Sequence, residues 1–232
     1  MGPLATARFY ERFVERSGSK RDQDHPSVYI AANPKIPDRT GYIEGVGSDP
    51  FPAILEEARR LELCGVDLIV VPCNSAALFG QRLASEASVP VIDWAGCAVD
   101  EVASREWSRV GLLATRGTIA AGVYQARFAS RGVDAVVPDD RCQALIMDAI
   151  YGPEGVKTMS AVTPAGVELL SAAAAKLVAE GAEGLLIACT ELPVITADAA
   201  WDPGVPIVDA GEAAIGACLE QLGALTTDMA GQ

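Results

Sequence analysis

The chain carries one sequence pattern twice. In each copy a run of apolar residues follows a glycine, ends on a cysteine, and is followed by a Val-Pro segment that ends on an aspartate. The landmarks of the two copies are separated by the same 116 residues (181 − 65, 189 − 73 and 209 − 93) and are Gly65, Cys73 and Asp93, then Gly181, Cys189 and Asp209. This repeat predicts two similar halves with a site between them, to which each half contributes one thiol.

Short, continuous apolar runs alternate with longer segments of helical periodicity. Runs bounded by glycine, proline or aspartate are typical of parallel strands buried on both faces. The predicted strands cover residues 28–32, 68–72, 89–92, 110–114, 135–137, 185–188 and 206–208, and the clearest predicted helices cover 52–64, 95–104, 164–180 and 211–222. The alternation predicts an α/β fold of two pseudo-symmetric lobes with mostly parallel sheets and right-handed crossovers. Asp93 and Asp209 each precede a predicted helix and are expected to cap it.

The two halves differ at their beginnings. In the second half a predicted strand over 110–114 leads into a helix that contains Phe128. The matching helix of the first half contains Phe13, and the strand that would match 110–114 falls before Met1. We therefore expect the first lobe, residues 1–105 and 206–232, to lack its first strand, which leaves an unpaired sheet edge. The second lobe is expected to cover residues 106–205.

Composition disfavours several classes of function. The formal net charge of −13 disfavours nucleic-acid binding, because phosphates demand basic surfaces. No apolar run reaches the roughly 18–20 residues of a membrane span, and no signal peptide is visible, so we expect a cytoplasmic protein without membrane contact. The single histidine, His25, lies in a polar loop, which disfavours a histidine-based triad or a multi-histidine zinc site.

Cysteine is the residue type that points to chemistry. There are six cysteines and no Cys-x-x-Cys spacing, so disulfide bonds are not expected in a cytoplasmic protein. Four of them are expected to be small buried hydrophobes, namely Cys64, Cys97, Cys142 and Cys218. Cys73 and Cys189 instead end matching strands, and ligands of open α/β sheets collect at the carboxyl ends of strands.

Small polar residues follow both of these thiols at the start of possible helices. Asn74 and Ser75 follow the first thiol, and Thr190 and Glu191 follow the second. Backbone N–H groups at a helix start bind carboxylates and lower the pKa of a nearby thiol. A thiolate and a thiol on opposite sides of one carbon can remove a proton from one face and deliver one to the other. The alternative is a pair of buried cysteines at strand ends without a chemical role.

Several segments resemble the aspartate/glutamate racemase superfamily, and together they cover nearly the whole chain. They are Cys-Asn-Ser-Ala at 73–76, Ala-Cys-Thr-Glu-Leu-Pro at 188–193, Met-Gly-Pro-Leu-Ala-Thr-Ala-Arg-Phe-Tyr at 1–10, and the segments 22–26, 33–40 and 150–157, which resemble the aspartate racemase branch. The resemblance implies a cytoplasmic amino-acid racemase that uses no metal or other cofactor. It also implies an active site in the cleft between two lobes, and a homodimer.

The resemblance further implies a role for each site residue and a small acidic amino acid, aspartate or glutamate, as the substrate. The implied residues are Cys73 and Cys189 for proton transfer; Asn74, Ser75 and Thr190 for the α-carboxylate; Arg39 and Lys157 for a side-chain carboxylate; and Met1, Gly2 and Glu191 as further contacts. From the residues alone, the two cations are ordinary loop residues, and Glu191 is a capping carboxylate with a possible part in proton relay.

Differences from the family pattern leave the substrate open. Aspartate racemases usually carry Thr-Ala-His after the Cys-Asn pair, where this chain has Ser-Ala-Ala, and glutamate racemases usually carry histidine where it has Glu191. Trp94 is also bulky for a position near the lobe junction. The alternatives are a hydantoin racemase, a maleate cis–trans isomerase-like enzyme, or a non-catalytic protein that binds a small acid. The pair Arg39 and Lys157 favours a dicarboxylate over a hydantoin.

Overall fold

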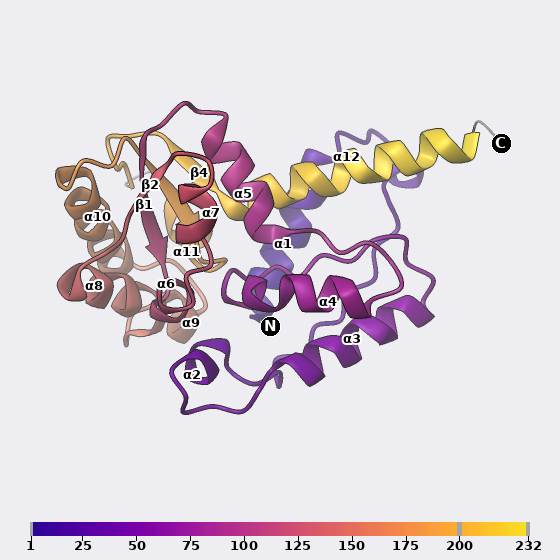
Figure 1. Ribbon diagram of the computed structural model, residues 1–232, viewed down its shortest axis with the longest axis horizontal. Helices are drawn as coiled ribbons and strands as arrows, with labels where there is room; N and C mark the ends of the chain where they lie inside the picture. The colour runs from indigo at the N-terminus through magenta and orange to yellow at the C-terminus, as the bar shows by residue number, and fades with distance from the viewer. Residues whose placement is uncertain (1, 199–200, 231–232) are drawn as a thin grey trace.

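A computed structural model of the chain describes residues 2–198 and 201–230, and they form an α/β fold built on one parallel sheet (Figure 1). The four strands lie in the order β2-β1-β3-β4, and all neighbours are parallel. The strands are β1 (Arg109–Ala114), β2 (Asp134–Val136), β3 (Gly184–Ala188) and β4 (Ile207–Asp209). The predicted α/β class and the four strands predicted in the second half of the pattern are therefore confirmed.

Helices cover both faces of the sheet because its strands carry apolar side chains on both faces. Leu185 and Ile187 share one core with the helices α8 and α10, whereas Leu186 shares another with α5 and α12. Alternate residues of one strand thus enter different cores, as the two-residue period of a strand requires. The bounds of these helices are Trp94–Ala103 for α5, Asp140–Tyr151 for α8, Pro164–Ala179 for α10 and Ala210–Ala230 for α12.

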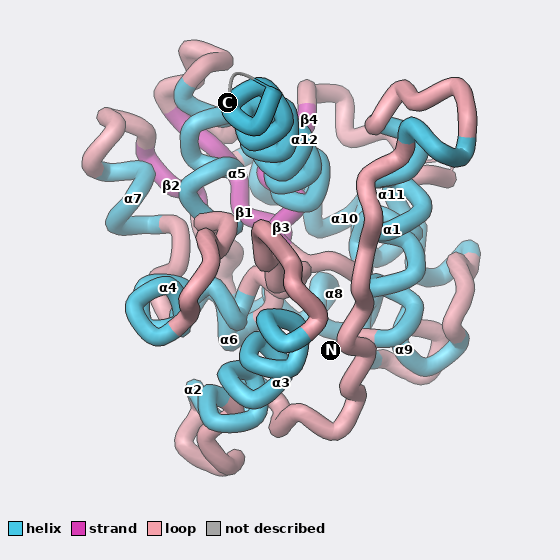
Figure 2. Tube along the Cα trace, turned by 90° about the vertical axis from the view of Figure 1, so that its right-hand side faces the viewer, coloured by secondary structure: helices cyan, strands magenta, loops and turns pink. Residues whose placement is uncertain are grey.

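The first half of the chain is mostly helical and forms a third core. Phe51, Ile54, Leu55 and Ala58 are buried along one face of α3, at the spacing of an amphipathic helix. In Figure 2, α2, α3 and α4 form a group apart from the strands. The further elements are α1 (Pro3–Arg16), α2 (Arg39–Ile43), α3 (Phe51–Leu63), α4 (Gly80–Glu86), α6 (Arg116–Ala120), α7 (Gln125–Ala129), α9 (Val156–Met159) and α11 (Leu192–Thr196), with 3₁₀ turns over Asp22–Asp24 and Ser75–Phe79.

Glycine ends the two matching helices, as the repeat predicts. Gly65 follows α3 with φ of 75°, and Gly181 follows α10 with φ of 94°. Only glycine adopts such angles without a steric penalty, so the chain leaves each helix at the same point and turns into the segment that ends on a thiol.

Three predicted strands of the first half are wrong. Residues 28–32 are irregular, and the predicted strands 68–72 and 89–92 are reduced to one isolated parallel bridge between Ile69 and Val91. A strand exists only where a neighbour pairs with its backbone, and apolar composition alone does not supply that neighbour. In addition, Pro72 and Pro90 have no backbone N–H to donate.

Two ion pairs join the halves in a reciprocal way. Asp93 of the first half accepts from Arg127 of the second at 2.6 Å, and Asp209 of the second accepts from Arg12 of the first at 2.8 Å. Both aspartates also accept a backbone N–H at the start of the following helix, so the predicted caps are confirmed. The same residue type at matching positions thus starts a helix and connects it to the other half.

The lobe boundaries stay a prediction. Residues 207–209, which the sequence assigns to the first lobe, pair with β3 at the edge of the four-stranded sheet. Within the described part of the chain, no helix combines the length and the apolar character needed to cross a bilayer.

Candidate active site

Both predicted thiols line one cavity at the junction of the two halves. Cys73 follows the residues 68–72 and Cys189 follows β3, and both side chains are buried, with 8% and 5% of their surface exposed. The cavity is lined by Gly2, Asp38, Arg39, Thr40, Pro72, Cys73, Asn74, Ser75, Thr115, Thr118, Tyr151, Lys157, Ala188, Cys189, Thr190 and Glu191. The structure therefore brings together every predicted site residue that it describes; Met1 lies outside the described residues.

Arg39 is the cation on the Cys73 side of the cavity. Asp38 caps α2 by accepting from the backbone of Gly41 at 2.6 Å, and this turn places Arg39 at the first position of the helix. The buried guanidinium donates to the carbonyl of Pro37 at 3.0 Å, while its Nε has no partner. Burial works against its charge, but Cys73, Asp38 and Tyr151 together outweigh burial, so the pKa of Arg39 is raised. The prediction from the residues alone, that Arg39 is an ordinary loop residue, is therefore wrong: it lies in α2 and its side chain is buried beside Cys73.

Cys189 lies beside a negative charge instead. Its Sγ donates to Glu191 Oε2 at 3.2 Å, and the Thr190 hydroxyl donates to the same oxygen at 3.1 Å. Burial, and then the charge of Glu191, raise the pKa of Cys189 well above the usual value of a thiol. The sequence predicts a lowered pKa at this helix start, and for Cys189 that prediction is wrong. The cause is the loss of water around the sulfur, reinforced by the neighbouring carboxylate.

Lys157 completes the Cys189 side. Its Nζ lies 3.2 Å from Glu191 Oε1 and 4.8 Å from the centre of the Tyr151 ring. Burial disfavours the ammonium, but Glu191, Tyr151 and Cys189 together outweigh burial, so the pKa of Lys157 is raised and the side chain stays charged. Gly2 faces the same carboxylate, because a Cβ atom there would lie 2.6 Å from Glu191 Oε1. The two thiols thus have opposite neighbours: a cation beside Cys73 and a carboxylate beside Cys189.

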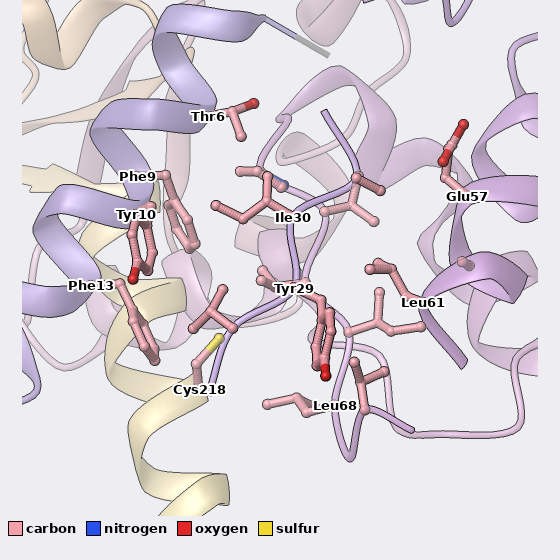
Figure 3. A pocket seen from close by; sticks show the side chains of 18 of the residues that line it. Thr6, Phe9, Tyr10, Phe13, Tyr29, Ile30, Glu57, Leu61, Leu68 and Cys218 are labelled. Carbon is pink, nitrogen blue, oxygen red and sulfur yellow. The ribbon is translucent and has the colours of Figure 1, made fainter. Parts of the chain in front are cut away.

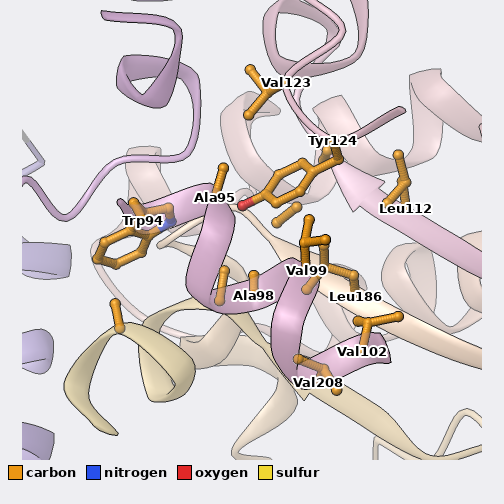
Figure 4. Close-up of a cluster of buried hydrophobic side chains, with 14 of the residues drawn as sticks. Trp94, Ala95, Ala98, Val99, Val102, Leu112, Val123, Tyr124, Leu186 and Val208 are labelled. Atoms are coloured by element: carbon orange, nitrogen blue, oxygen red, sulfur yellow. The ribbon is translucent and has the colours of Figure 1, made fainter. Parts of the chain in front are cut away.

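Asn74 is held in one orientation by two aromatic residues that the sequence did not point to as site residues. Its Oδ1 accepts from Trp94 Nε1 at 2.9 Å and from the Tyr124 hydroxyl. Because an indole N–H can only donate, the amide oxygen must face Trp94, and the amide N–H₂ faces away. That Nδ2 is buried without a partner, beside the cavity that Asn74 lines. Figure 4 shows the Tyr124 hydroxyl directed toward the start of α5, where Trp94 lies.

Further cavity residues could have been found by extending one rule. Thr115 follows β1 at the same edge of the sheet at which Cys189 follows β3, so the carboxyl-end rule that selected the thiols also selects Thr115. Tyr151 and Thr118 carry no comparable signal, because only the packing of helices around the sheet brings them to the cavity. Within residues 2–198 and 201–230 there is no group of three or more acidic, histidine or cysteine side chains that could hold a metal ion.

Comparisons with known proteins agree with this arrangement. Residues 1–218 match the Asp/Glu/Hydantoin racemase family.

The chain belongs to that family.

Among characterised relatives, this racemase is 26% identical over 218 residues to the broad specificity amino-acid racemase RacX of Bacillus subtilis, covering 90% of this chain and 89% of that protein. It also resembles the solved structure of Picrophilus torridus aspartate racemase, with a TM-score of 0.80 and 26% identity, over 96% of this chain and 90% of that one. The fold is shared with an aspartate racemase homologue from Pyrococcus horikoshii, with a TM-score of 0.68 and 23% identity, over 96% and 95% of the two chains. The predicted family and the predicted enzyme class, an amino-acid racemase, are confirmed.

The carboxylate beside Cys189 gives a testable pH effect. Replacing Glu191→Gln removes a negative charge that raises the pKa of Cys189, so that pKa falls and more thiolate is present at any given pH. We expect alkylation of Cys189 by iodoacetamide at pH 8 to become about tenfold faster, which corresponds to about one pKa unit. Site-resolved mass spectrometry measures the rate.

The same sample contains an internal control. Burial raises the pKa of Cys142 to about 11; this thiol lies on the buried face of α8 and does not line the active-site cavity. Its alkylation rate should not change in Glu191→Gln. An unchanged rate at Cys189 would show that burial alone sets the pKa of that thiol.

Proposed function

We propose that this racemase interconverts the L and D forms of an acidic amino acid, aspartate or glutamate, by proton transfer between two cysteines and without pyridoxal phosphate. The observation that carries the proposal is that Cys73 and Cys189, one from each half, line one cavity together with Arg39 and Lys157. The names of the relatives, an aspartate racemase and a broad specificity amino-acid racemase, agree with it.

The groups beside the two thiols have opposite charges, and this difference indicates which thiol removes the proton and which one donates it. Cys73, with the guanidinium of Arg39 beside it, acts as the thiolate base and removes the α-proton from one face of the substrate. Cys189 retains its proton because its pKa is raised, and it delivers that proton to the opposite face. The net change is one proton taken up by Cys73, one released by Cys189, and inversion at the α-carbon. The reverse reaction exchanges the two roles.

The carbanion between these steps needs donors that are already in place. The amide of Asn74, which lines the cavity, is fixed by two aromatic residues that hold its Oδ1, and its Nδ2 has no partner. The Ser75 hydroxyl lies 3.5 Å from the Cys73 sulfur. These groups stabilise charge on the α-carboxylate as the proton leaves, and the Thr190 hydroxyl, which donates to Glu191 in this structure, joins them once that carboxylate moves. Arg39 and Lys157 are then available for the side-chain carboxylate of the substrate.

Substrate entry requires the cavity to open. Its volume is about 20 Å³, room for little more than one water molecule and too small for an amino acid. The ion pair between Lys157 and Glu191 closes part of this space. A substrate carboxylate that replaces Glu191 as the partner of Lys157 would both open the cavity and move a negative charge.

The aromatic clamp on Asn74 predicts a catalytic effect without loss of the fold. In Tyr124→Phe one of the two donors to Oδ1 is lost, which weakens the hold on the amide by about 1 kcal/mol, the typical net contribution of a hydrogen bond. We expect kcat to fall about fivefold. The matched control is Tyr10→Phe, which removes an exposed hydroxyl from α1. An unchanged kcat in Tyr124→Phe would mean that the orientation of Asn74 does not limit the reaction.

Exchange of the α-proton in D₂O tests the proposed function directly. The protein is incubated separately with L-aspartate, L-glutamate and L-alanine, and the α-proton signal is followed by NMR. Loss of the signal with an acidic substrate, together with growth of the D form, supports the proposal and identifies the substrate. Saturable binding without exchange would favour a non-catalytic small-acid-binding protein. Exchange with alanine but with neither acid would refute the acidic preference.

The alternatives within the family are disfavoured by charge. An uncharged hydantoin ring has no carboxylate to pair with the cations of Arg39 and Lys157, so it gains nothing from their charges. Maleate carries two carboxylates but no tetrahedral stereocentre. Including maleate as a fourth substrate in the D₂O experiment therefore distinguishes a maleate cis–trans isomerase from an amino-acid racemase. A homodimer and a cytoplasmic location stay predictions from the resemblance.

A further inference from the structure

The space that a substrate needs is not present beside the two thiols. The active-site cavity has a volume of about 20 Å³, far less than an amino acid occupies. The largest cavity among the described residues, about 270 Å³, lies elsewhere, between α1, α3 and α12. In Figure 3, Phe9 and Phe13 face Tyr29 and Ile30 across that cavity, and neither thiol lines it. A substrate therefore reaches the thiols only if an element that lines the smaller cavity moves.

Helix α2 is an element that can move as one piece. The backbone N–H of Gly47 donates to the carbonyl of Gly41 at 2.9 Å, so the chain after α2 folds back onto the helix. Ile36, before α2, and Phe51, after the returning chain, are both buried in the third core. The segment between these two residues is thus held at its ends, while its middle forms a compact unit.

The contact that holds α2 beside the cavity comes from the second half. Helix α2 packs on α6 (Figure 1). A Cβ atom at Gly117 of α6 would lie 2.7 Å from Thr40 Oγ1, 2.9 Å from Thr40 Cα and 3.0 Å from Thr40 Cβ, whereas ordinary contacts of a Cβ atom are 3.4–4 Å long. The two helices therefore touch at this pair of residues, and the missing side chain of glycine allows them to come so close.

Both helices carry residues of the active site next to this contact. Arg39 and Thr40 of α2 line the cavity together with Thr118 of α6. The buried guanidinium of Arg39 has an Nε without a partner, and such a donor suits a substrate carboxylate. The distance between α2 and α6 thus decides whether this donor reaches a substrate in the cavity.

We propose that Gly117 is a positioning residue, which lets α2 close over a bound acid and brings Arg39 to the side-chain carboxylate. Helix α2 leaves α6 to admit the substrate and packs on it again afterwards. Gly117 does not itself line the cavity, so it acts through the helix that carries Arg39. The inference rests on the proposed function, because it assigns Arg39 to an acidic substrate. A neutral amino acid has no side-chain carboxylate for Arg39, so closure favours acids.

The kinetics of Gly117→Ala test this role. The added Cβ separates α2 from α6 and makes the closed state less populated, although a saturating substrate still draws α2 shut. We expect KM for the acidic substrate to rise about tenfold while kcat changes by less than about twofold, and KM for a neutral amino acid to change by less than about twofold. The matched control is Gly80→Ala at the start of α4, because no atom lies within 4 Å of a Cβ there.

A second substitution tests the contact itself. Thr40→Gly removes two of the three atoms that lie closest to the added Cβ. In Gly117→Ala combined with Thr40→Gly, we therefore expect KM to return to within about threefold of its value in Thr40→Gly alone. A general loss of stability at position 117 would not be reversed by a change on a different helix.

Cleavage by trypsin after Arg39 tests the packing of α2 without any activity measurement. Arg39 is buried, so cleavage requires α2 to leave α6, and its rate follows the population of the open form. We expect this cleavage to be about tenfold faster in Gly117→Ala than in the original chain or in Gly80→Ala. Mass spectrometry identifies the cleaved bonds, and cleavage after the exposed Arg131 is the internal reference.

Faster cleavage after Arg39 together with a raised KM for the acid supports the proposal. An unchanged cleavage rate in Gly117→Ala overturns it, and so does an equal fall in kcat for acidic and neutral substrates, which would indicate general damage to the active site. If the original chain racemises no amino acid, the proposed function fails, whereas the cleavage rates still decide whether Gly117 holds α2 in place.

Discussion

Replacing either Cys73 or Cys189 by serine is expected to reduce racemisation by about 10³-fold, the scale of one positioned acid or base. A serine hydroxyl has nearly the same shape as a thiol but ionises far less readily, so it neither removes nor donates the α-proton effectively at neutral pH. The rate of conversion is measured by polarimetry or chiral chromatography in both directions. Cys142→Ser is the matched control, because that thiol lies on the buried face of α8 and outside the active-site cavity.

The two variants should also fail in different ways. Cys73→Ser retains the thiol of Cys189, and Cys189→Ser retains the proposed base. In D₂O, Cys189→Ser should therefore still exchange the α-proton of one enantiomer slowly, whereas exchange of the other enantiomer is lost; Cys73→Ser should show the opposite preference. Equal exchange of both enantiomers in one variant would contradict a reaction with one thiol on each face.

Removing the buried guanidinium of Arg39 is expected to have the second largest effect. In Arg39→Gln a side-chain carboxylate loses a charge-assisted partner, worth about 2–3 kcal/mol, which corresponds to a fall in kcat/KM of about 10²-fold for the acidic substrate. Lys157→Gln should act in the same direction, and in addition it leaves Glu191 without its cation. Steady-state kinetics with aspartate, glutamate and alanine give the values.

Comparing acidic with neutral substrates shows whether Arg39→Gln weakens substrate binding or disturbs the active site in general. A neutral amino acid has no side-chain carboxylate, so Arg39→Gln should reduce its turnover much less than that of the acid. Arg59→Gln, an exposed arginine on α3, is the matched control and should change neither. If all substrates lose activity equally in Arg39→Gln, the guanidinium supports Cys73 rather than the substrate carboxylate.

Much of the site was predictable because it depends on neighbours in the sequence. The residues that follow β3 and the segment 68–72 reach the same edge of the fold by the rule for parallel strands. The motifs around the thiols, 73–76 and 188–193, contain seven of the sixteen residues that line the cavity. The clamp on Asn74 was not predictable in this way, since Trp94 lies 20 residues and Tyr124 lies 50 residues further along the chain. Only packing of α5 against the second half brings both aromatic rings onto one amide.

Local sequence patterns are enough to predict the two-fold repeat, the ends of the helices, the strands of the second half and the two thiols of the site. These depend on local periodicity, on glycine at positive φ and on aspartate at helix starts, all of which act within a few residues. The tertiary structure decides which apolar runs become strands and which charged group lies beside each thiol. A strand forms only where another strand pairs with its backbone. Residues 28–32 have no such pairing partner among the described residues, and residues 68–72 have a single bridge, between Ile69 and Val91. The protonation of Cys189 depends on burial and on a carboxylate that the fold holds beside its sulfur.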